Sequence, residues 1–358
     1  QRFLSPLTGE AEGRPMLPDL EPKALVEFLE LMLLTRRFEE QLIELSQERN
    51  IGHFHVYIGQ ESTGIPALSL LEQGDLSFTN HRNHGHLIAR GAEPGPMYAE
   101  ILGRVTGYCR GKGGTLHLAS AEHGFPTTSS ATGGCIPPAV GAGFGFQRLG
   151  SDRVSVCLIG DGALEEGAWH ESANIAAMEL LPVIFLCENN SLEALGQRAG
   201  EYPSSTMAAS DLTELASVFG IESVAVNGLD TRAVYQTMAE AVHRARTGGG
   251  PTFIEARTVR WPGNRPIWPE LATGNTDLSM AWDASLIRED YAPWYREQDG
   301  LLGFARELVS SGFLTSETAL KLDVQASERV RKGLAFALDS PYPEPEEALE
   351  HVFAPHRG

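Results

Sequence analysis

The chain has 358 residues, of which 42% are hydrophobic and 21% are charged, so its composition is that of a folded protein and not of a disordered one. Forty-seven acidic residues against 28 basic ones give a formal net charge of −19. Because nucleic acids and anionic membranes are bound by basic surfaces, this acidity excludes a general role in binding either of them. A phosphorylated ligand would require a local region of positive potential.

The cysteines and the hydropathy pattern favour an intracellular, cytoplasmic protein. Cys109, Cys135, Cys157 and Cys187 form no C-x-x-C pair, so a zinc site made of cysteines is not expected, and in a chain of this length they are typical of reduced thiols. No segment approaches the roughly 20 apolar residues that a membrane-spanning helix needs. The first residues have no signal-peptide pattern.

The N-terminal part is predicted to be an extended lead-in followed by a long helix. Residues 1–20 contain prolines and scattered charges without periodicity. From Asp19 to about Glu48, apolar residues recur at helical spacing, which predicts a largely buried helix. Asp19 is the predicted N-cap.

The middle of the chain predicts an α/β domain over residues 21–260. Short, continuous apolar runs, typical of buried strands, alternate with longer helical stretches. The predicted strands are 154–159, 183–187, 221–226 and 252–256, and the predicted helices are 164–180, 212–219 and 231–247. Strand–helix–strand alternation is typical of parallel sheets, so we expect a doubly wound parallel sheet with helices on both faces.

The C-terminal part divides into an irregular segment and a helical extension. Residues 261–298 contain four of the five tryptophans and little periodicity, which indicates a long loop at a subunit interface or at an active site. Residues 299–358 form the predicted extension, with helices at 301–311 and 315–337.

Polar residues suited to a cation and a phosphate follow two neighbouring predicted strands. Asp161, between Gly160 and Gly162, follows the first strand, and Asn190 follows the second. Ligands of open α/β sheets bind beyond the carboxyl ends of the strands, and carboxylate and amide oxygens suit Mg²⁺. A helix predicted to start at about Ala163 would offer backbone N–H groups to a diphosphate.

Several ordered motifs resemble the alpha subunits of the thiamine diphosphate-dependent first component of 2-oxo acid dehydrogenase complexes, of the pyruvate, branched-chain and acetoin types. Gly160-Asp161-Gly162 and Asn189-Asn190 resemble the two ends of the thiamine diphosphate signature. The other matching segments are 52–61 (GHFHVYIGQE), 81–85 (HRNHG), 111–117 (GKGGTLH), 136–142 (IPPAVGA) and 162–174 (GALEEGAWHESAN). The resemblance covers nearly the whole chain and implies a thiamine diphosphate-binding fold.

The resemblance also implies roles for individual residues. Mg²⁺ would be held by the side chains of Asp161 and Asn190 and by the carbonyl of Leu192. The other implied cofactor contacts are made by Gly160, Gly162, Ala163, His81, Arg82, backbone at Ser130 and Thr132, and Asn264. The implied catalytic residues, on the thiazolium side or near the substrate, are His55, His84 and Asn264.

The implied enzyme decarboxylates a 2-oxo acid, or cleaves an acyloin, and transfers the resulting unit. The cofactor supplies the carbanion chemistry, and the protein supplies position and proton transfer. In the family a beta subunit completes the site, so an α₂β₂ heterotetramer is implied. Asn264 and Arg265 stand where the family usually has histidine and serine. A divergent acyloin-forming or acyl-transfer enzyme is therefore an alternative, and a lipoyl acyltransferase partner stays open.

Three other classes of function remain as alternatives. Five histidines between positions 53 and 86 could form the zinc site of a metal hydrolase. The glycines at 141, 143 and 145 could suggest a nicotinamide site, although their spacing does not match the fingerprint and no strand precedes them. A non-catalytic scaffold subunit is the third alternative.

Overall fold

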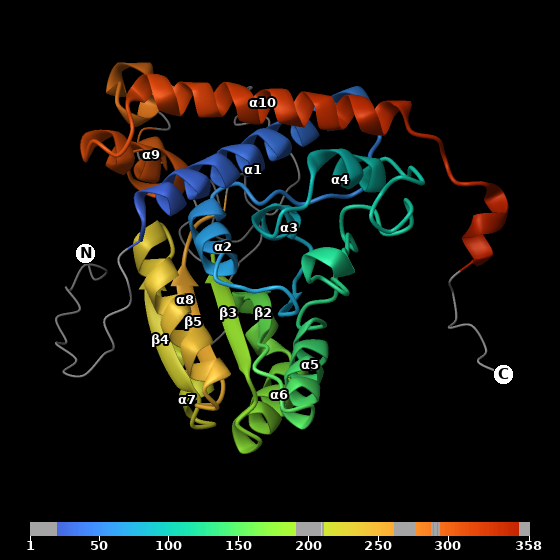
Figure 1. The fold of residues 1–358 in the computed structure, drawn as a ribbon, viewed down its shortest axis with the longest axis vertical. Coiled ribbons are helices and arrows are strands. Elements are labelled where there is room, and N and C mark those ends of the chain that lie inside the picture. Colours follow the sequence, from blue (N-terminus) through green and yellow to red (C-terminus); the bar gives the residue numbers. More distant parts are fainter. Residues whose placement is uncertain are drawn as a thin grey trace.

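The computed structural model describes residues 20–190, 209, 211–260, 276–287, 289, 292 and 294–350. Figure 1 shows a central sheet with helices on both sides and two long helices, α1 (Pro22–Glu48) and α10 (Ser316–Asp339), lying across one end of it. The predicted N-cap Asp19 and the lead-in 1–19 lie outside the described residues. Within the described part, α1 begins at a proline after Glu21, a position where the missing N–H costs no hydrogen bond.

The sheet has five parallel strands in the order β1-β2-β3-β5-β4. The strands are β1 (Leu76–Phe78), β2 (Ser155–Gly160), β3 (Val183–Asn189), β4 (Glu222–Asn227) and β5 (Thr252–Arg257). The predicted doubly wound parallel sheet is thus confirmed, and four of its strands lie within one or two residues of their predicted positions. Strand β1 was not predicted, because three residues are too few to produce a recognisable pattern.

Alternate side chains along the strands pack into two separate hydrophobic clusters, one on each face of the sheet. Leu158 and Leu186 belong to the larger cluster, which also contains residues of α1, α8 (Thr231–Arg246) and α10. Their neighbours Cys157 and Phe185 belong to the smaller cluster on the other face. That face is covered by α5 (Ile136–Arg148), α6 (Gly167–Met178) and α7 (Leu212–Ser217). The period-two alternation of side chains along each strand explains the two clusters.

Further helices connect the sheet to the long helices at its end. They are α2 (Glu61–Leu68), α3 (His84–Ala89), α4 (Pro94–Ile101) and α9 (Gly300–Ser310). Helices α9 and α10 confirm the two predicted C-terminal helices, and both bury residues in the same cluster as α1. The proposed domain boundaries stay a prediction. No helix among the described residues is long and apolar enough to cross a membrane.

A buried ion-pair network joins α1, α2 and the start of α9. The guanidinium of Arg36 lies 2.7 Å from Glu61 Oε1 and 2.9 Å from Asp299 Oδ2, and all three side chains are at most 2% exposed. Asp299 also accepts the backbone N–H groups of Leu301 and Leu302, and so caps α9. Because each charge is removed from water, the three residues depend on one another.

The Arg36→Ala substitution is expected to lower the free energy of unfolding by about 3–5 kcal/mol, because it leaves two buried carboxylates without their counter-charge. Urea-induced unfolding monitored by circular dichroism measures this. Lys23→Ala is the matched control, because it removes an exposed i,i+4 ion pair with Glu27 and should change the free energy by less than about 1 kcal/mol. Equal effects of the two substitutions would contradict the assignment.

Candidate functional site

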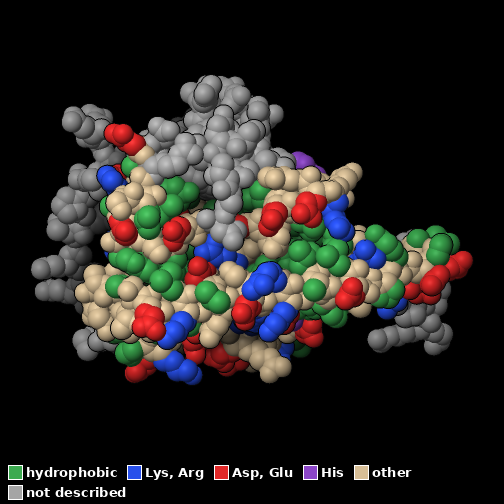
Figure 2. Space-filling model, turned by 90° about the horizontal axis from the view of Figure 1, so that it is seen from above, with side chains coloured by type: hydrophobic (Ala, Val, Ile, Leu, Met, Phe, Trp, Pro, Cys, Tyr) green, Lys and Arg blue, Asp and Glu red, His purple; other side chains and the backbone are tan. Residues whose placement is uncertain are grey.

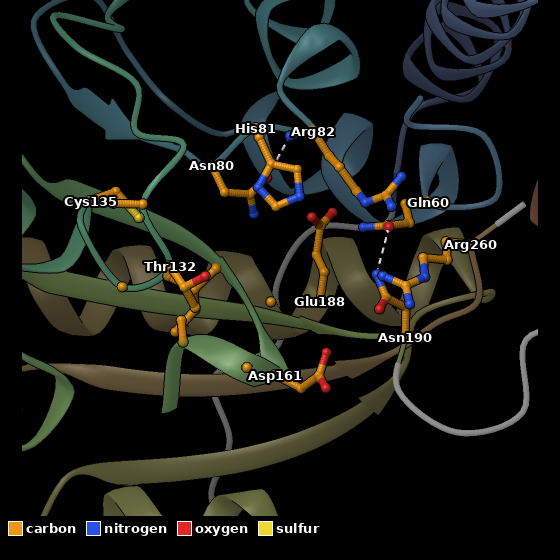
Figure 3. A pocket seen from close by; sticks show the side chains of 16 residues that line it. Gln60, Asn80, His81, Arg82, Thr132, Cys135, Asp161, Glu188, Asn190 and Arg260 are labelled. Carbon is orange, nitrogen blue, oxygen red and sulfur yellow. Dashed lines mark hydrogen bonds between the residues drawn. The ribbon is translucent and has the colours of Figure 1, made fainter. Parts of the chain in front are cut away.

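A cavity of about 240 Å³ lies beyond the carboxyl ends of β2 and β3 (Figure 3). Eight of the predicted site residues line it: His81, Arg82, Thr132, Gly160, Asp161, Gly162, Ala163 and Asn190. The parallel pairing of β2 with β3 places Gly160 opposite Glu188, and so carries the residues after both strands to one edge. Half of the lining residues are thus residues that the sequence analysis named, and their roles stay a prediction.

Asp161 presents a buried carboxylate to this cavity. The residue is 5% exposed, and its Oδ2 accepts no hydrogen bond from any part of the chain that the structure describes. Burial raises the pKa of the carboxyl to about 6, although the nearby Arg260 opposes the shift. A buried carboxylate oxygen without a hydrogen-bond donor is destabilising unless a ligand compensates it, and a cation would do so.

The backbone after Asp161 corrects one expectation about the helix. Residues Asp161–Glu165 form a 3₁₀ turn, and α6 begins only at Gly167, not at Ala163. Glu166 separates the two because its backbone is extended, with φ −82° and ψ 141°. The 3₁₀ turn, and not the first turn of a long helix, therefore borders the cavity. A Cβ at Gly160 would meet nothing within 4 Å, so the space beside this turn is open.

Two buried arginines make the opposite wall of the cavity positive. Burial, followed by the charge of Arg260, lowers the pKa of Arg82 to about 9. Burial also lowers the pKa of Arg260 to about 10, against the influence of Asp161. Arg82 donates from Nη1 to the carbonyl of Val56 at 2.6 Å, which fixes the direction of its guanidinium. An anion between the two arginines would stabilise both charges.

Glu188 is a site residue that sequence reasoning missed. It is 1% exposed, lines the cavity beside Arg82, and accepts a hydrogen bond from the hydroxyl of Tyr57. The Tyr57 ring fits between two helices because Gly64 and Gly85 have no side chain; a Cβ on Gly85 would lie 2.1 Å from the ring. The position of Glu188, directly before the two asparagines, was the available signal.

Gln60 and Arg260 are two further lining residues that the predicted site did not include. Asn190 donates from Nδ2 to Oε1 of Gln60 at 2.9 Å, as the dashed line in Figure 3 marks. Gln60 belongs to the matched segment 52–61, and Arg260 follows β5. The matched segment was therefore an available signal for Gln60, whereas Arg260 reaches the cavity from the chain after β5.

Three histidines lie in a row from the surface to the cavity. The Nε2 atoms of His53 and His55 are 3.1 Å apart, and the rings of His55 and His81 are 4.5 Å apart between centroids. Burial, followed by the charge of Arg82, lowers the pKa of His81 to about 4 and that of His55 to about 3. Both imidazoles are therefore neutral at physiological pH, so each has a ring nitrogen that can accept a hydrogen bond.

His84 and Ser130 lie outside the cavity lining. His84 is fully buried, with Nδ1 3.0 Å from Glu39 Oε1 and Nε2 2.7 Å from Thr115 Oγ1. It is placed to support the surrounding loops and not to touch a ligand in the cavity. Ser130 is exposed, and its hydroxyl lies 3.1 Å from His117 Nε2. Leu192 and Asn264 lie outside the described residues.

The glycine-rich loop at 111–114 is organised around an internal anion. The buried Glu100 accepts backbone N–H groups from Cys109, Gly111 and Gly113, at 2.7, 2.8 and 2.6 Å. Lys112 donates instead to backbone carbonyls of Glu347 and Glu350. The loop amides are therefore already engaged by Glu100 and do not form a phosphate-binding loop.

The alternatives from the sequence do not fit this geometry. No group of three or more His, Cys, Asp or Glu side chains in the described part of the chain is arranged to hold a metal ion, which argues against a zinc hydrolase. Gly141, Gly143 and Gly145 lie inside α5 and not at a strand-to-helix turn, so the context of a dinucleotide fingerprint is missing.

Comparison with known proteins decides the family. The model of the dehydrogenase E1 component family matches residues 29–346. The chain belongs to the dehydrogenase E1 component family. It is therefore an enzyme component, an oxidoreductase of the thiamine diphosphate-dependent class, as the sequence motifs predicted, and not a scaffold or a metal hydrolase.

The most similar relatives include two kinds of E1 alpha subunit. The alpha subunit of acetoin:2,6-dichlorophenolindophenol oxidoreductase from Bacillus subtilis is 34% identical over 93% of this chain and 94% of its own. The subunit of the same name from Cupriavidus necator is 31% identical over 97% and 99%. The pyruvate dehydrogenase E1 component subunit alpha from Rhizobium meliloti is 34% identical over 90% and 87%.

The raised pKa of Asp161 predicts a pH-dependent change in stability. In the ligand-free chain, Asp161→Asn is expected to increase the free energy of unfolding by about 1–3 kcal/mol at pH 7.5, because it removes a buried charge. The folded pKa, about 6, lies above the unfolded value. The wild type therefore gains stability relative to the variant as pH falls through 6 and toward the unfolded pKa of roughly 4. Thermal unfolding between pH 4.5 and 8 tests this, and a constant difference would contradict it.

Proposed function

We propose that the chain binds the diphosphate end of thiamine diphosphate together with Mg²⁺, at an interface with a beta subunit in an α₂β₂ heterotetramer. The enzyme then acts on a 2-oxo acid or on an acyloin such as acetoin. The observation that carries the proposal is the pairing, in one cavity, of two buried arginines with the buried carboxylate of Asp161, whose Oδ2 accepts no hydrogen bond from the described residues.

The donor set fits a divalent cation. The carboxylate of Asp161 and the amide oxygen of Asn190 are hard oxygen ligands of the kind that Mg²⁺ prefers, and both side chains line the cavity. Mg²⁺ is commonly bound by one or two protein groups plus phosphate oxygens and water, so two side-chain ligands are sufficient. The carbonyl of Leu192 is the proposed third protein ligand, as the family resemblance implies.

The basic wall fits a diphosphate. Arg82 and Arg260 are 4% and 8% exposed, and the charge of Arg260 lowers the pKa of Arg82. An anion placed between the two guanidinium groups would stabilise their charged forms. The 3₁₀ turn at Asp161–Glu165, with open space beside Gly160, allows a phosphate to approach the backbone. Thr132 lies 4.0 Å from the position of a Cβ on Gly162, on the same side of the cavity.

When bound, thiamine diphosphate supplies a carbanion and an electron sink for cleaving the bond next to a carbonyl. This chain anchors the charged end and holds neutral histidines beside it. His81 borders the cavity, and His55 packs against it on the side of the surface. His55 is the proposed acid–base group, as the family resemblance implies, and its neutral imidazole can accept a hydrogen bond from a substrate hydroxyl. His84 is proposed as a positioning residue, because it is buried between Glu39 and Thr115.

The choice of substrate class can be tested directly. The two acetoin relatives are named for the artificial electron acceptor 2,6-dichlorophenolindophenol. Reduction of this dye by the full chain with its beta subunit should be measured with acetoin, with pyruvate and with a branched-chain 2-oxo acid. Turnover of at least one, dependent on thiamine diphosphate, is expected. No turnover of any 2-oxo acid or acyloin would contradict the proposal.

Asp161→Ala is expected to abolish Mg²⁺-dependent binding of thiamine diphosphate, because it removes the charged ligand of the cation. Isothermal titration calorimetry with and without Mg²⁺ measures this. Asp339→Ala, at the exposed end of α10, is the matched control and should bind as the wild type does. Wild-type affinity in the Asp161 variant would refute the cation site.

A divergent acyl-transfer or acyloin-forming reaction without a lipoyl acceptor is the second candidate, favoured by Asn264 where the family usually has histidine. Asparagine can hydrogen-bond but cannot exchange a proton near neutral pH. If Asn264 directs the fate of the acyl unit, Asn264→His should change the ratio of products, measured by chromatography. A change in rate alone would count against this second candidate.

A further inference from the structure

The amide of Asn190 has a fixed direction in the cavity, and Gln60 fixes it. Asn190 Nδ2 donates to Gln60 Oε1 at 2.9 Å, and the two residues are 6% and 1% exposed. Figure 3 shows the oxygen of Asn190 on the side away from Gln60, the side on which Asp161 is drawn. The hydrogen bond thus turns the amide oxygen toward the proposed cation and the NH₂ group away from it.

This orientation matters because an asparagine amide is chemically two-sided. Its oxygen is a cation ligand, whereas its NH₂ group carries positive hydrogens that repel a cation. The two rotamers have nearly the same shape, so packing alone distinguishes them poorly. An acceptor at the position of Gln60 Oε1 is satisfied by only one of them. Groups that orient metal ligands in this way commonly contribute one to two orders of magnitude to metal affinity.

The backbone at Gln60 is held by contacts of the residues on either side of it. On one side, Glu61 accepts from Arg36 Nε at 2.7 Å within the buried ion-pair network, and its other oxygen accepts the N–H of Gly59 at 2.7 Å. The start of α2 is therefore fixed to α1. Gln60 stands directly before α2, so its backbone has little freedom to follow a change in the cavity.

On the other side, Gly59 packs against the chain that leaves β5. Its φ is +98°, and a Cβ there would lie 2.5 Å from the carbonyl oxygen of Val259. Thr258 donates from Oγ1 to the carbonyl of Gly59 at 3.3 Å. The segment that carries Gln60 therefore packs between α1 and the residues that lead to Arg260. Arg260 itself lines the cavity.

We infer that Gln60 is a positioning residue for the divalent cation: it orients the amide of Asn190 so that Oδ1 faces the metal. This inference rests on the proposed function, because it requires Mg²⁺ at Asp161 and Asn190. It assigns Gln60 no contact with the reacting atoms. The ion-pair network of Arg36 would then do more than stabilise the fold, because it would also support the residue that orients Asn190.

The test measures the Mg²⁺ concentration at which thiamine diphosphate binding is half-maximal, by calorimetry on the full chain with its beta subunit. Gln60→Leu removes the acceptor and should raise this concentration by roughly 10- to 100-fold, while saturating Mg²⁺ restores cofactor affinity. Gln60→Glu keeps an acceptor for Asn190 and adds a negative charge near the cation, so it should not raise this concentration above the wild-type value. Gln325→Leu makes the same chemical change on the exposed face of α10 and should have no effect.

Three other results have distinct meanings. If the half-maximal Mg²⁺ concentration of Gln60→Leu equals that of the wild type, the positioning role is overturned. If this variant loses cofactor affinity equally at every Mg²⁺ concentration, Gln60 contacts the diphosphate or supports the fold, and the inference is also overturned. If the wild type binds thiamine diphosphate without any divalent cation, the proposed function fails first, and the inference fails with it.

Discussion

The burial of charge at the carboxyl edge of the sheet is the constraint on which the rest of the structure depends. Asp161, Arg82 and Arg260 all lie there with less than a tenth of their surface exposed. Such groups destabilise the ligand-free chain, so their positions must be held by the surrounding fold. The buried pairs of Arg36 with Glu61 and Asp299 supply this support, because they lock α1, α2 and α9 around the loops that carry the site.

The fold could be predicted wherever the chain itself determined it. Strands β2 and β3 are continuous apolar runs, because both faces of the sheet are covered, and α10 shows helical periodicity over its whole length. The start of α6 at Gly167 was not predicted, because the extended backbone of Glu166 separates it from the 3₁₀ turn, and a glutamate is not a residue type that usually ends a helical stretch. Strand β1 could not be predicted from the sequence either, because its three residues form a strand only by pairing with β2.

The candidate site, like the fold, was predicted where the local sequence determines it and missed elsewhere. Asp161 and Asn190 follow strands and were predicted from that position and from their chemistry. Glu188 lies at the end of β3 beside Asn190 and could have been named from that position. Gln60 and Arg260 enter the cavity because segments distant in the sequence meet there. His84 illustrates the converse, because its motif suggested contact with a ligand, whereas its two nitrogen atoms are engaged by Glu39 and Thr115 in the interior.

The buried carboxylate of Glu100 stabilises the loop at 109–114 from inside the protein. Backbone amides that converge on one point commonly form a binding site for a phosphate or another anion. Here the convergent amides enclose a carboxylate of the same chain, carried on α4. The loop amides therefore donate to an anion that belongs to the same chain. One of the chain's many acids thus acts as an internal structural anion that organises this loop.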